Sequence, residues 1–197
     1  LRVLQRYHKT ITQRNHLLRR MRDVGSGATD ELYFWNTELA KNGSIIIEYR
    51  LRLMEHLTGM ARRFYFQLTG DCENLEATYQ PSLNLRGRHD RIELEALLTD
   101  ALEQNRSREV AAGISLVGPH RDDLIVRING TSGSIFGSRG QVRTAVLALR
   151  LAEAEYVRQI RQDEPILLFD DVLSELDHRR RSQVLELAGS YQQTILT

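Results

Sequence analysis

Residues 137–149 read G-S-R-G-Q-V-R-T-A-V-L-A-L, a short polar turn followed by the start of an amphipathic pattern. Ser138 with Gln141 three positions later fits a capping box, in which each side chain binds the backbone N–H group of the other residue. The apolar residues that follow recur at helical spacing, which predicts a helix that packs on a core and runs to about residue 161. The turn therefore predicts where a central helix of the fold begins.

The same turn has the features of an anion site. A helix start leaves backbone N–H groups free and carries the positive end of the helix dipole. Gly140 would let a phosphate approach the backbone closely, because it has no side chain. On these residues alone, a plain capped helix is favoured over a phosphate site, and both interpretations stay open.

A second informative stretch is Ile166–Asp171, four apolar residues followed by two carboxylates. An all-apolar run of this length is typical of a buried parallel strand. Its end would place Asp170 and Asp171 at the carboxyl edge of a sheet, where α/β proteins bind ligands. One acid there can hold Mg²⁺, and its neighbour can orient or deprotonate an attacking water. The alternative is an Asp that only caps the turn, but two adjacent acids favour a metal and nucleotide role.

A third motif, S-E-L-D at Ser174–Asp177, follows at once and again fits a capping box. The helix that it would start runs to about residue 188. This helix begins with H-R-R-R, which puts positive charge at the positive end of the helix dipole. The placement indicates either arginines that bind an anion, from protein or nucleic acid, or a solvated face.

The order of these motifs resembles a known family. S-x-G-Q, an apolar strand ending in D-D, and S-E-L-D resemble the signature motif, the Walker B strand and the D-loop of ABC-type ATPases. Together with G-P-H-R-D-D-L at Gly118–Leu124, they resemble the RecF family of bacterial recombination and replication-repair ATPases, which is related to SMC heads. The resemblance is detailed over Gly118–Thr197, and over the first seventy residues it rests on order and helical character.

The resemblance implies roles at the signature motif and the D-loop. Ser138, Gly140 and Gln141 would contact the γ-phosphate of ATP held by the opposite subunit of a homodimer. Ser174 and Asp177 would lie in the loop that crosses between the subunits.

The resemblance also implies that Asp170 binds Mg²⁺ through water and that Asp171 stands at the position of the catalytic acid. ABC transporters usually have Glu at that second position, so Asp suits a slow switch ATPase. A P-loop, G-x-x-x-x-G-K-[ST], is absent, since neither Lys9 nor Lys41 follows a glycine. We therefore expect the chain to be a piece without the N-terminal Walker A half, and to be inactive as an ATPase on its own.

The expected fold class combines α+β and α/β features: a helical arm of antiparallel helices, then the C-terminal lobe of an ABC-type P-loop ATPase head. Helical spacing covers residues 1–24 and 29–68, and two long helices with a short connection form an antiparallel hairpin. We assign 1–70 to the arm and 71–197 to the lobe, with a helix at about 90–110 that could belong to the arm.

Short strands are expected between and after these helices. Alternation predicts strands at 75–79 and 114–117, and a third at 122–128 that turns at Asn129-Gly130, a strong hairpin signal. A final strand is expected at 193–197.

The composition limits the function classes. The chain is 41% hydrophobic and 27% charged, as is ordinary for a globular protein, and no run of eighteen apolar residues predicts a membrane span. The lone Cys72 excludes an internal disulfide and fits a reducing compartment, the cytoplasm. The net charge of +1 does not by itself indicate a nucleic-acid binder.

Lys9 and Lys41 are the only lysines, so nearly all positive charge comes from arginine, whose planar group suits phosphate. A GC-rich genome explains this bias equally well. We expect contacts with duplex DNA from two arginine clusters, where the alternative is solvation or pairing with nearby acids. The candidates are Arg86, Arg88 and Arg91 in the loop R-G-R-H-D-R, and then Arg62 and Arg63.

The function expected from the resemblance is DNA replication, repair and recombination mediation by an ATP-dependent homodimer. Slow ATP hydrolysis would release duplex DNA, including DNA at junctions of single and double strands. Recombination mediator proteins such as RecR are the expected protein partners. The alternatives are a non-enzymatic protein-interaction module and a head fragment of another SMC-type ATPase.

Overall fold

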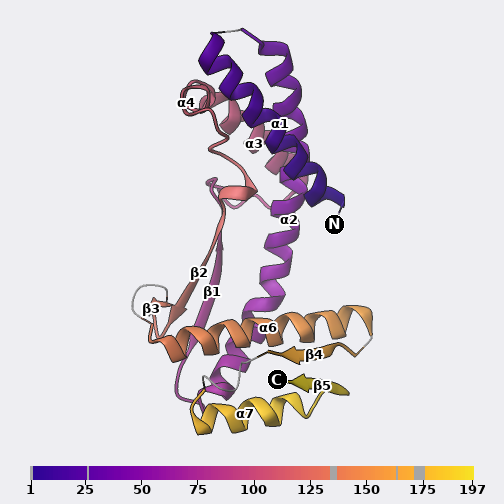
Figure 1. Ribbon diagram of the computed structural model, residues 1–197, viewed down its shortest axis with the longest axis vertical. Coiled ribbons are helices and arrows are strands. Elements are labelled where there is room, and N and C mark those ends of the chain that lie inside the picture. Colours follow the sequence, from indigo (N-terminus) through magenta and orange to yellow (C-terminus); the bar gives the residue numbers. More distant parts are fainter. Residues whose placement is uncertain (1, 26, 134–136, 163, 171–175) are drawn as a thin grey trace. The chain divides into compact units, whose positions relative to one another are not determined.

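The described part of the chain combines long helices with two small sheets, so the expected mixture of α and β structure is confirmed (Figure 1). No helix in this part is both long and apolar enough to cross a membrane. The computed structural model describes residues 2–25, 27–133, 137–162, 164–170 and 176–197.

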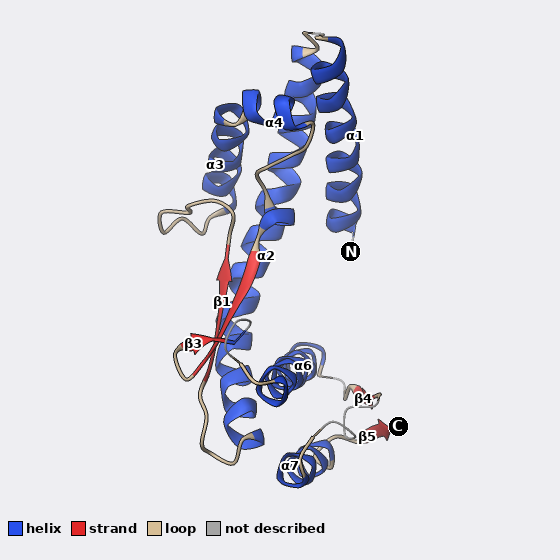
Figure 2. Ribbon diagram, turned by 60° about the vertical axis from the view of Figure 1, so that its left-hand side comes forward, coloured by secondary structure: helices blue, strands red, loops and turns tan. Residues whose placement is uncertain are grey.

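Two long helices open the chain. α1 spans Arg2–Val24 and α2 spans Thr29–Leu68, close to the bounds expected from the apolar spacing. α1 and the first part of α2 lie side by side and run in opposite directions (Figures 1 and 2). The antiparallel hairpin predicted from their short connection is therefore confirmed.

The residues divide into two compact units, and each unit takes two stretches of chain. Unit 1 contains Leu1–Arg52 and Tyr79–Asp123, and unit 2 contains Leu53–Thr78 and Leu124–Thr197. α2 contributes residues to both units, so the division does not follow the boundary expected near residue 70. Compact units and family domains are defined by different criteria, and the division into an arm and a lobe stays a prediction.

Unit 1 is mainly helical. α3 spans Arg91–Gln104 and α4 spans Arg106–Ala112, where the sequence pattern suggested one helix. Asp90 is the N-cap of α3, since its carboxylate accepts the N–H of Ile92 at 2.9 Å. A short 3-10 turn spans Pro119–Arg121.

The strand expected at 114–117 is wrong, because this segment is irregular. Two of its backbone donors bind side chains instead of a neighbouring strand. The Ser115 N–H group donates to Asn15 Oδ1 at 2.7 Å, and the Leu116 N–H group donates to Glu109 Oε1 at 2.7 Å. Side chains from α1 and α4 therefore satisfy the donors that would otherwise need a sheet.

Gly43 shows how closely the helices of unit 1 approach one another. It lies inside α2, where glycine is ordinarily unfavourable. A Cβ atom at this position would lie 3.1 Å from Leu98 and 3.4 Å from Tyr7. The core around it is formed by α1, α2, α3 and the following segment, with these residues buried: Tyr7, Leu39, Ala40, Ile46, Ile47, Leu94, Leu98, Leu102 and Val117.

Unit 2 packs around α6, which spans Arg139–Arg161 as the capping and spacing signals predict. Its buried side contacts the end of α2, β1, β4 and α7. The buried core residues of α6 are Ala145, Leu147, Ala148, Leu151 and Ala152.

One sheet holds three strands in the order β1, β2, β3. They span Leu75–Gln80, Asp123–Ile128 and Thr131–Ser132. β2 and β3 are antiparallel and turn at Asn129 and Gly130, whose φ angles are 50° and 79°. Two positive φ angles are what this hairpin turn requires, so the Asn-Gly prediction is confirmed.

The second sheet pairs β4 (Ile166–Phe169) with β5 (Gln193–Leu196) in parallel, through the crossover helix α7 (His178–Ala188). Burial on both faces of β4 was expected, but Ile166 is 61% exposed and Leu168 is 65% exposed. Side chains alternate along a strand, and among the described residues only the face with Leu167 and Phe169 is covered. The apolar run correctly predicted the strand. The burial that it predicted for the face with Ile166 and Leu168 was wrong.

Candidate functional site

The start of α6 is held by a complete capping box. Ser138 Oγ accepts the Gln141 N–H group at 3.2 Å, and the Gln141 side chain accepts the Ser138 N–H group at 2.9 Å. The first four N–H groups of a helix have no partner within the helix, and the box satisfies two of them, those of Ser138 and Gln141. The other N–H groups of this turn, including that of Gly140, are therefore not satisfied by the helix itself, as an anion site would require.

Glu73 connects this turn to two other elements of unit 2. Its Oε2 atom accepts the Gln141 side-chain amide at 3.1 Å and the Tyr65 hydroxyl at 2.7 Å. Its Oε1 atom lies 3.7 Å from the guanidinium of Arg180, near the start of α7. The Glu73 side chain keeps 21% of its surface exposed. One carboxylate thus gathers donors from α2, α6 and α7.

The Tyr65 hydroxyl acts as a donor to this carboxylate. Burial, with the hydrogen bond to Glu73 and its negative charge, raises the pKa of Tyr65 well above the ordinary tyrosine value. The hydroxyl therefore stays protonated at neutral pH and fixes the position of Glu73 from the α2 side.

The start of α7 contributes Asp177 and Arg180. Asp177 is the N-cap, and its carboxylate accepts the Arg180 N–H group at 2.8 Å. The Arg180 guanidinium also lies 3.5 Å from the Asp177 carboxylate. A Cβ atom placed on Gly140 would lie 2.8 Å from Nη1 of Arg180, so the guanidinium lies directly against that glycine. The turn at 138–141 and the start of α7 are therefore neighbours.

Arg179 and Arg180, in the run that begins α7, have identifiable partners. Arg180 pairs with Glu73 and Asp177, and Arg179 donates to the Gly70 carbonyl at 3.1 Å. The sequence left open whether this run binds an anion or forms a solvated face. Within the chain, Glu73 and Asp177 supply anions for Arg180.

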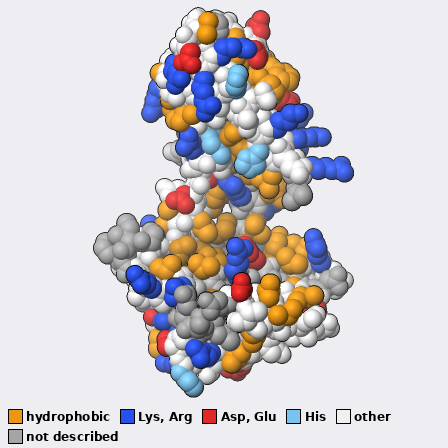
Figure 3. Space-filling model, in the orientation of Figure 1, with side chains coloured by type: hydrophobic (Ala, Val, Ile, Leu, Met, Phe, Trp, Pro, Cys, Tyr) orange, Lys and Arg blue, Asp and Glu red, His pale blue; other side chains and the backbone are white. Residues whose placement is uncertain are grey.

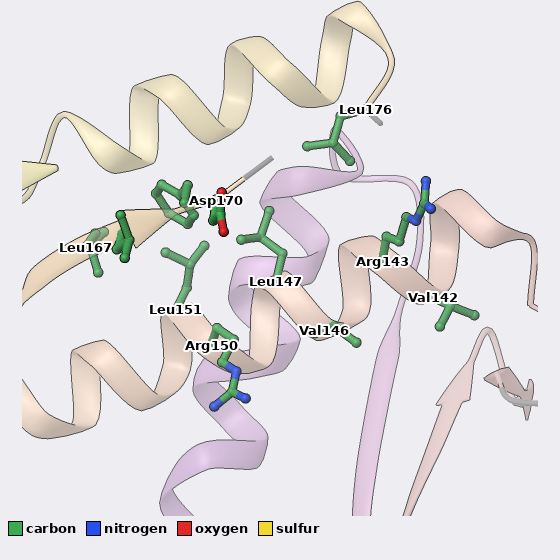
Figure 4. Close-up of a pocket in the computed structure, with 11 residues that line it drawn as sticks. Val142, Arg143, Val146, Leu147, Arg150, Leu151, Leu167, Asp170 and Leu176 are labelled. Atoms are coloured by element: carbon green, nitrogen blue, oxygen red, sulfur yellow. The ribbon is translucent and has the colours of Figure 1, made fainter. Parts of the chain in front are cut away.

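Asp170 ends β4 and lines a mainly apolar pocket of about 440 Å³ between β4 and α6 (Figure 4). Its carboxylate accepts the Thr197 hydroxyl at 2.8 Å. Arg143 and Leu147 of α6 line the same pocket. Among the described residues, no group of three or more His, Cys, Asp and Glu side chains could hold a metal ion.

Two predicted site residues, Asp171 and Ser174, lie outside the described residues. The arginine candidates for DNA belong to different units: Arg62 and Arg63 lie on the exposed side of α2 in unit 2. In unit 1, Arg86 and Arg88 lie in a loop, but Arg91, also expected there, is the first residue of α3. The guanidinium of Arg63 stacks over the Phe64 ring, 5.2 Å from its centroid.

Sequence reasoning missed Glu73, Tyr65 and the part that Arg180 plays. Glu73 precedes β1 without any recognisable motif around it. The local signal was the arginine run, which indicated either an anion nearby or a solvated face.

Curated relatives match the chain along its length. It is 42% identical over 199 residues to the DNA replication and repair protein RecF of Herpetosiphon aurantiacus. The match covers 100% of this chain and 50% of that relative. It is also 42% identical over 196 residues to the protein of the same name from Heliobacterium modesticaldum, with 99% of this chain and 52% of the relative covered. No protein-family model matches the chain.

Two solved structures agree with this. They are described as the recombination mediator proteins RecF-ATP and RecF-ATPrS in the RecFOR pathway, and both are 32% identical to this chain. Their TM-scores are 0.85 and 0.87, and each match covers 99% of this chain and 52% of the RecF chain. The chain spans about half the length of the curated relatives it matches. Over that whole span, the chain matches these RecF proteins in sequence and in fold.

Proposed function

We propose that this chain supplies the signature side of an ATP-dependent DNA replication and repair protein, a recombination mediator whose homodimer closes on duplex DNA. The observation that carries the proposal is the start of α6, a capped helix terminus that Glu73 and Arg180 connect to the start of α7. Fixed N–H groups at a helix N-terminus favour a phosphate oxygen, because they need no rearrangement when the anion arrives.

ATP is the anion that the family relationship favours, since the two RecF structures compared above are described with ATP and ATPrS. Ser138, Gly140 and Gln141 would contact the γ-phosphate of ATP held by the opposite subunit. Asp177 and Ser174 would lie in the loop that crosses between the subunits.

Asp170 is the residue that would hold Mg²⁺ through water. A single carboxylate suits that ion, which commonly takes its remaining ligands from water and nucleotide phosphates. Mg²⁺ would neutralise charge on the phosphate oxygens. The hydrogen bond from Thr197 already orients the Asp170 carboxylate at the end of β4. Asp171 would orient or deprotonate the attacking water, in a slow hydrolysis that releases DNA.

Glu73 is a positioning residue in this proposal. It contacts Gln141 and Arg180, so it would act through these two side chains. An arriving phosphate at Gly140 would meet the Arg180 guanidinium, which lies against that glycine. Glu73 and the phosphate would then share one cation, which couples nucleotide binding to the start of α7.

Residues 1–70 would form a helical arm, and 71–197 would form the C-terminal lobe of the ATPase head. The partners proposed for the whole protein are duplex DNA, including junctions with single strands, and mediator proteins such as RecR. The DNA contacts proposed first lie in the loop at 86–91 and next at Arg62 and Arg63.

Substitution of Ser138 by arginine in the full-length protein tests the proposal. Ser138→Arg is expected to abolish ATP-driven dimerisation while a single subunit still binds nucleotide nearly as before, because a bulky cation would block only the closing surface. Size-exclusion chromatography with ATP and an equilibrium nucleotide titration measure the two effects. The matched control is Ser138→Thr, which retains a capping hydroxyl and adds no charge.

The opposite pattern would contradict the proposal. A large loss of ATP affinity in the single subunit would show that the turn acts within its own subunit. A full-length protein that neither binds ATP nor hydrolyses it with DNA present would instead support a non-enzymatic interaction module.

A further inference from the structure

The exposed face of α1 is strongly positive, although the net charge of the whole chain is close to zero. The whole chain has a net charge of +1. In Figure 3, Lys, Arg and His side chains gather over the upper part of the molecule, where α1 faces the viewer. The helix has a single acid, Asp23, and its basic residues are Arg2, Arg6, Lys9, Arg14, Arg19, Arg20 and Arg22.

Six exposed positions of α1 form one row, which we call the α1 row. Positions 2, 6, 9, 13, 16 and 20 alternate steps of four and three residues, so they stay within an arc of roughly 80°. The row is roughly 27 Å long, since an α-helix rises 1.5 Å per residue. It has no acidic and no apolar side chain. Its members are Arg2, Arg6, Lys9, Gln13, His16 and Arg20.

Most cations of the α1 row have no acid beside them. Among the described residues, no ion pair involves Arg2, Arg6 or Lys9. Arg20 is the exception within the row, because it pairs with Glu31 of α2. The first half of the row is thus the part with unneutralised positive charge.

The opposite side of α1 is fixed in unit 1, which holds the row in one orientation. Arg14 is fully buried and donates to Glu109 at 2.5 Å and to Asn36 at 2.8 Å. Tyr7 and Leu18 on the same side are also buried in the core. A rigid helix that presents a row of cations loses little conformational entropy when it binds a regular polyanion.

The chemistry of the row selects one class of partner. A membrane surface would require an apolar helix face next to the charge, but the apolar face of α1 is buried. A protein interface ordinarily has an aromatic or aliphatic centre, and the row has none. Binding dominated by charge alone, over a length approaching one duplex turn of about 34 Å, is what a DNA backbone offers.

We propose that the α1 row is a contact surface for the phosphate backbone of duplex DNA, with Arg2, Arg6 and Lys9 as its main contacts. This inference rests on the proposed DNA-binding function and places the surface on α1, apart from the loop at 86–91. The recognition is independent of sequence, because cations on one helix face reach phosphates and not base edges.

The test measures duplex affinity of the full-length protein against salt concentration, with ATP present. The triple variant Arg2→Gln, Arg6→Gln, Lys9→Gln is expected to bind about tenfold more weakly, with the salt slope of log K reduced by roughly 0.9 for each lost contact. The effect should be the same on unrelated DNA sequences. Arg22→Gln is the matched control: it removes one cation of the same helix outside the row, where Arg22 pairs with Asp23.

A second variant separates charge from shape. Arg2→Lys, Arg6→Lys with Lys9 unchanged retains the cations and is expected to retain the slope. A triple glutamine variant that unfolds normally in urea and keeps the wild-type slope would overturn the α1 assignment. Wild-type protein that binds no duplex at all would instead contradict the proposed function, so the two failures are distinguishable.

Discussion

The Arg14–Glu109 pair in unit 1 and the Glu73–Arg180 pair in unit 2 are built alike but differ in exposure. Arg14 and Glu109 are both fully buried, and Arg14 also donates to Asn36 and Ser115 at 2.8 Å each. Glu73 and Arg180 keep about a fifth of their surfaces exposed, at 21% and 20%. Each pair joins three or more segments through one carboxylate.

The difference in exposure suggests a structural role for the Arg14–Glu109 pair and a functional role for the Glu73–Arg180 pair. A fully buried pair cannot exchange partners without leaving a charge in a medium of low polarity, which is costly. A pair open to water at a helix terminus can exchange one partner for an arriving anion. We therefore interpret the Arg14–Glu109 pair as a fixed support for the hairpin, and the Glu73–Arg180 pair as an adjustable connection.

The largest effect is expected from breaking the buried pair. Arg14→Met should lower the free energy of unfolding by about 3–5 kcal/mol, because Glu109 would remain buried without its cation. Urea unfolding measures the change. The double variant Arg14→Met, Glu109→Leu should recover most of the loss, since both charges are then removed. If Arg14→Met lowered the free energy of unfolding by less than about 1 kcal/mol, the buried pair would not differ from the exposed pair in the way proposed.

A smaller effect is expected at the exposed pair. Glu73→Ala should lower the free energy of unfolding by about 1–3 kcal/mol, because the Tyr65 hydroxyl loses its acceptor. In the full-length protein it should also weaken ATP-driven dimerisation. Tyr65→Phe is the control, since it removes the same hydrogen bond but leaves Glu73 with Gln141 and Arg180.

The two variants together decide whether the connection is adjustable. If Glu73→Ala and Tyr65→Phe change dimerisation equally, the carboxylate only stabilises the fold and does not couple the two helix starts. Glu73→Gln, which retains an acceptor but not the charge, should lie between them in dimerisation.

Much of the fold could be predicted because its signals are local. The helices 2–24, 29–68 and 139–161 follow apolar periodicity, and the Asn129–Gly130 turn needs only two adjacent residues. The segment 114–117 could not be predicted, since its backbone donors bind Asn15 and Glu109. Such pairing depends on residues brought together only by folding.

The candidate site divides in the same way. The box of Ser138 and Gln141 spans three residues, so the sequence was sufficient to predict it. Glu73 gathers partners from α2, α6 and α7, and no pattern along the chain marks it. The exposure of Ile166 and Leu168 was also not predicted, because an apolar run does not show which face of a strand is packed against another element.

Variants of the capping box test how much this local motif contributes to the stability of the fold. Ser138→Ala should lower the free energy of unfolding by about 1 kcal/mol, because the Gln141 N–H group loses its acceptor. Ser138→Asp should restore the loss, since its carboxylate can accept the same N–H group. Urea unfolding of both variants is the measurement. Equal stability of the wild type and Ser138→Ala would mean that contacts with α7, and not the box, hold the start of α6.

The smallest effect is expected at His120, which lies beside the buried network of unit 1. Its Nδ1 atom accepts the Tyr7 hydroxyl at 2.8 Å, and its Nε2–H group donates to the Ser115 carbonyl at 3.2 Å. In this arrangement the ring is neutral, and partial burial, with the charge of Arg121, lowers the pKa of His120 below 6.5. Below about pH 6.5 the unfolded chain therefore takes up a proton that the folded chain does not.

The free energy of unfolding should consequently fall as the pH is lowered from 7 to 5. Above pH 7 the ring is neutral in both states, so the destabilisation caused by its protonation should vanish. The ring is partly open to water, so the slope should be shallow. His120→Gln removes the titrating group, and the difference between the urea midpoints of the wild type and this variant should narrow or reverse as the pH falls. A difference that stays constant between pH 7 and 5 would show that the network tolerates a charged ring. The rigid support assigned to unit 1 would then be as adjustable as the Glu73–Arg180 pair.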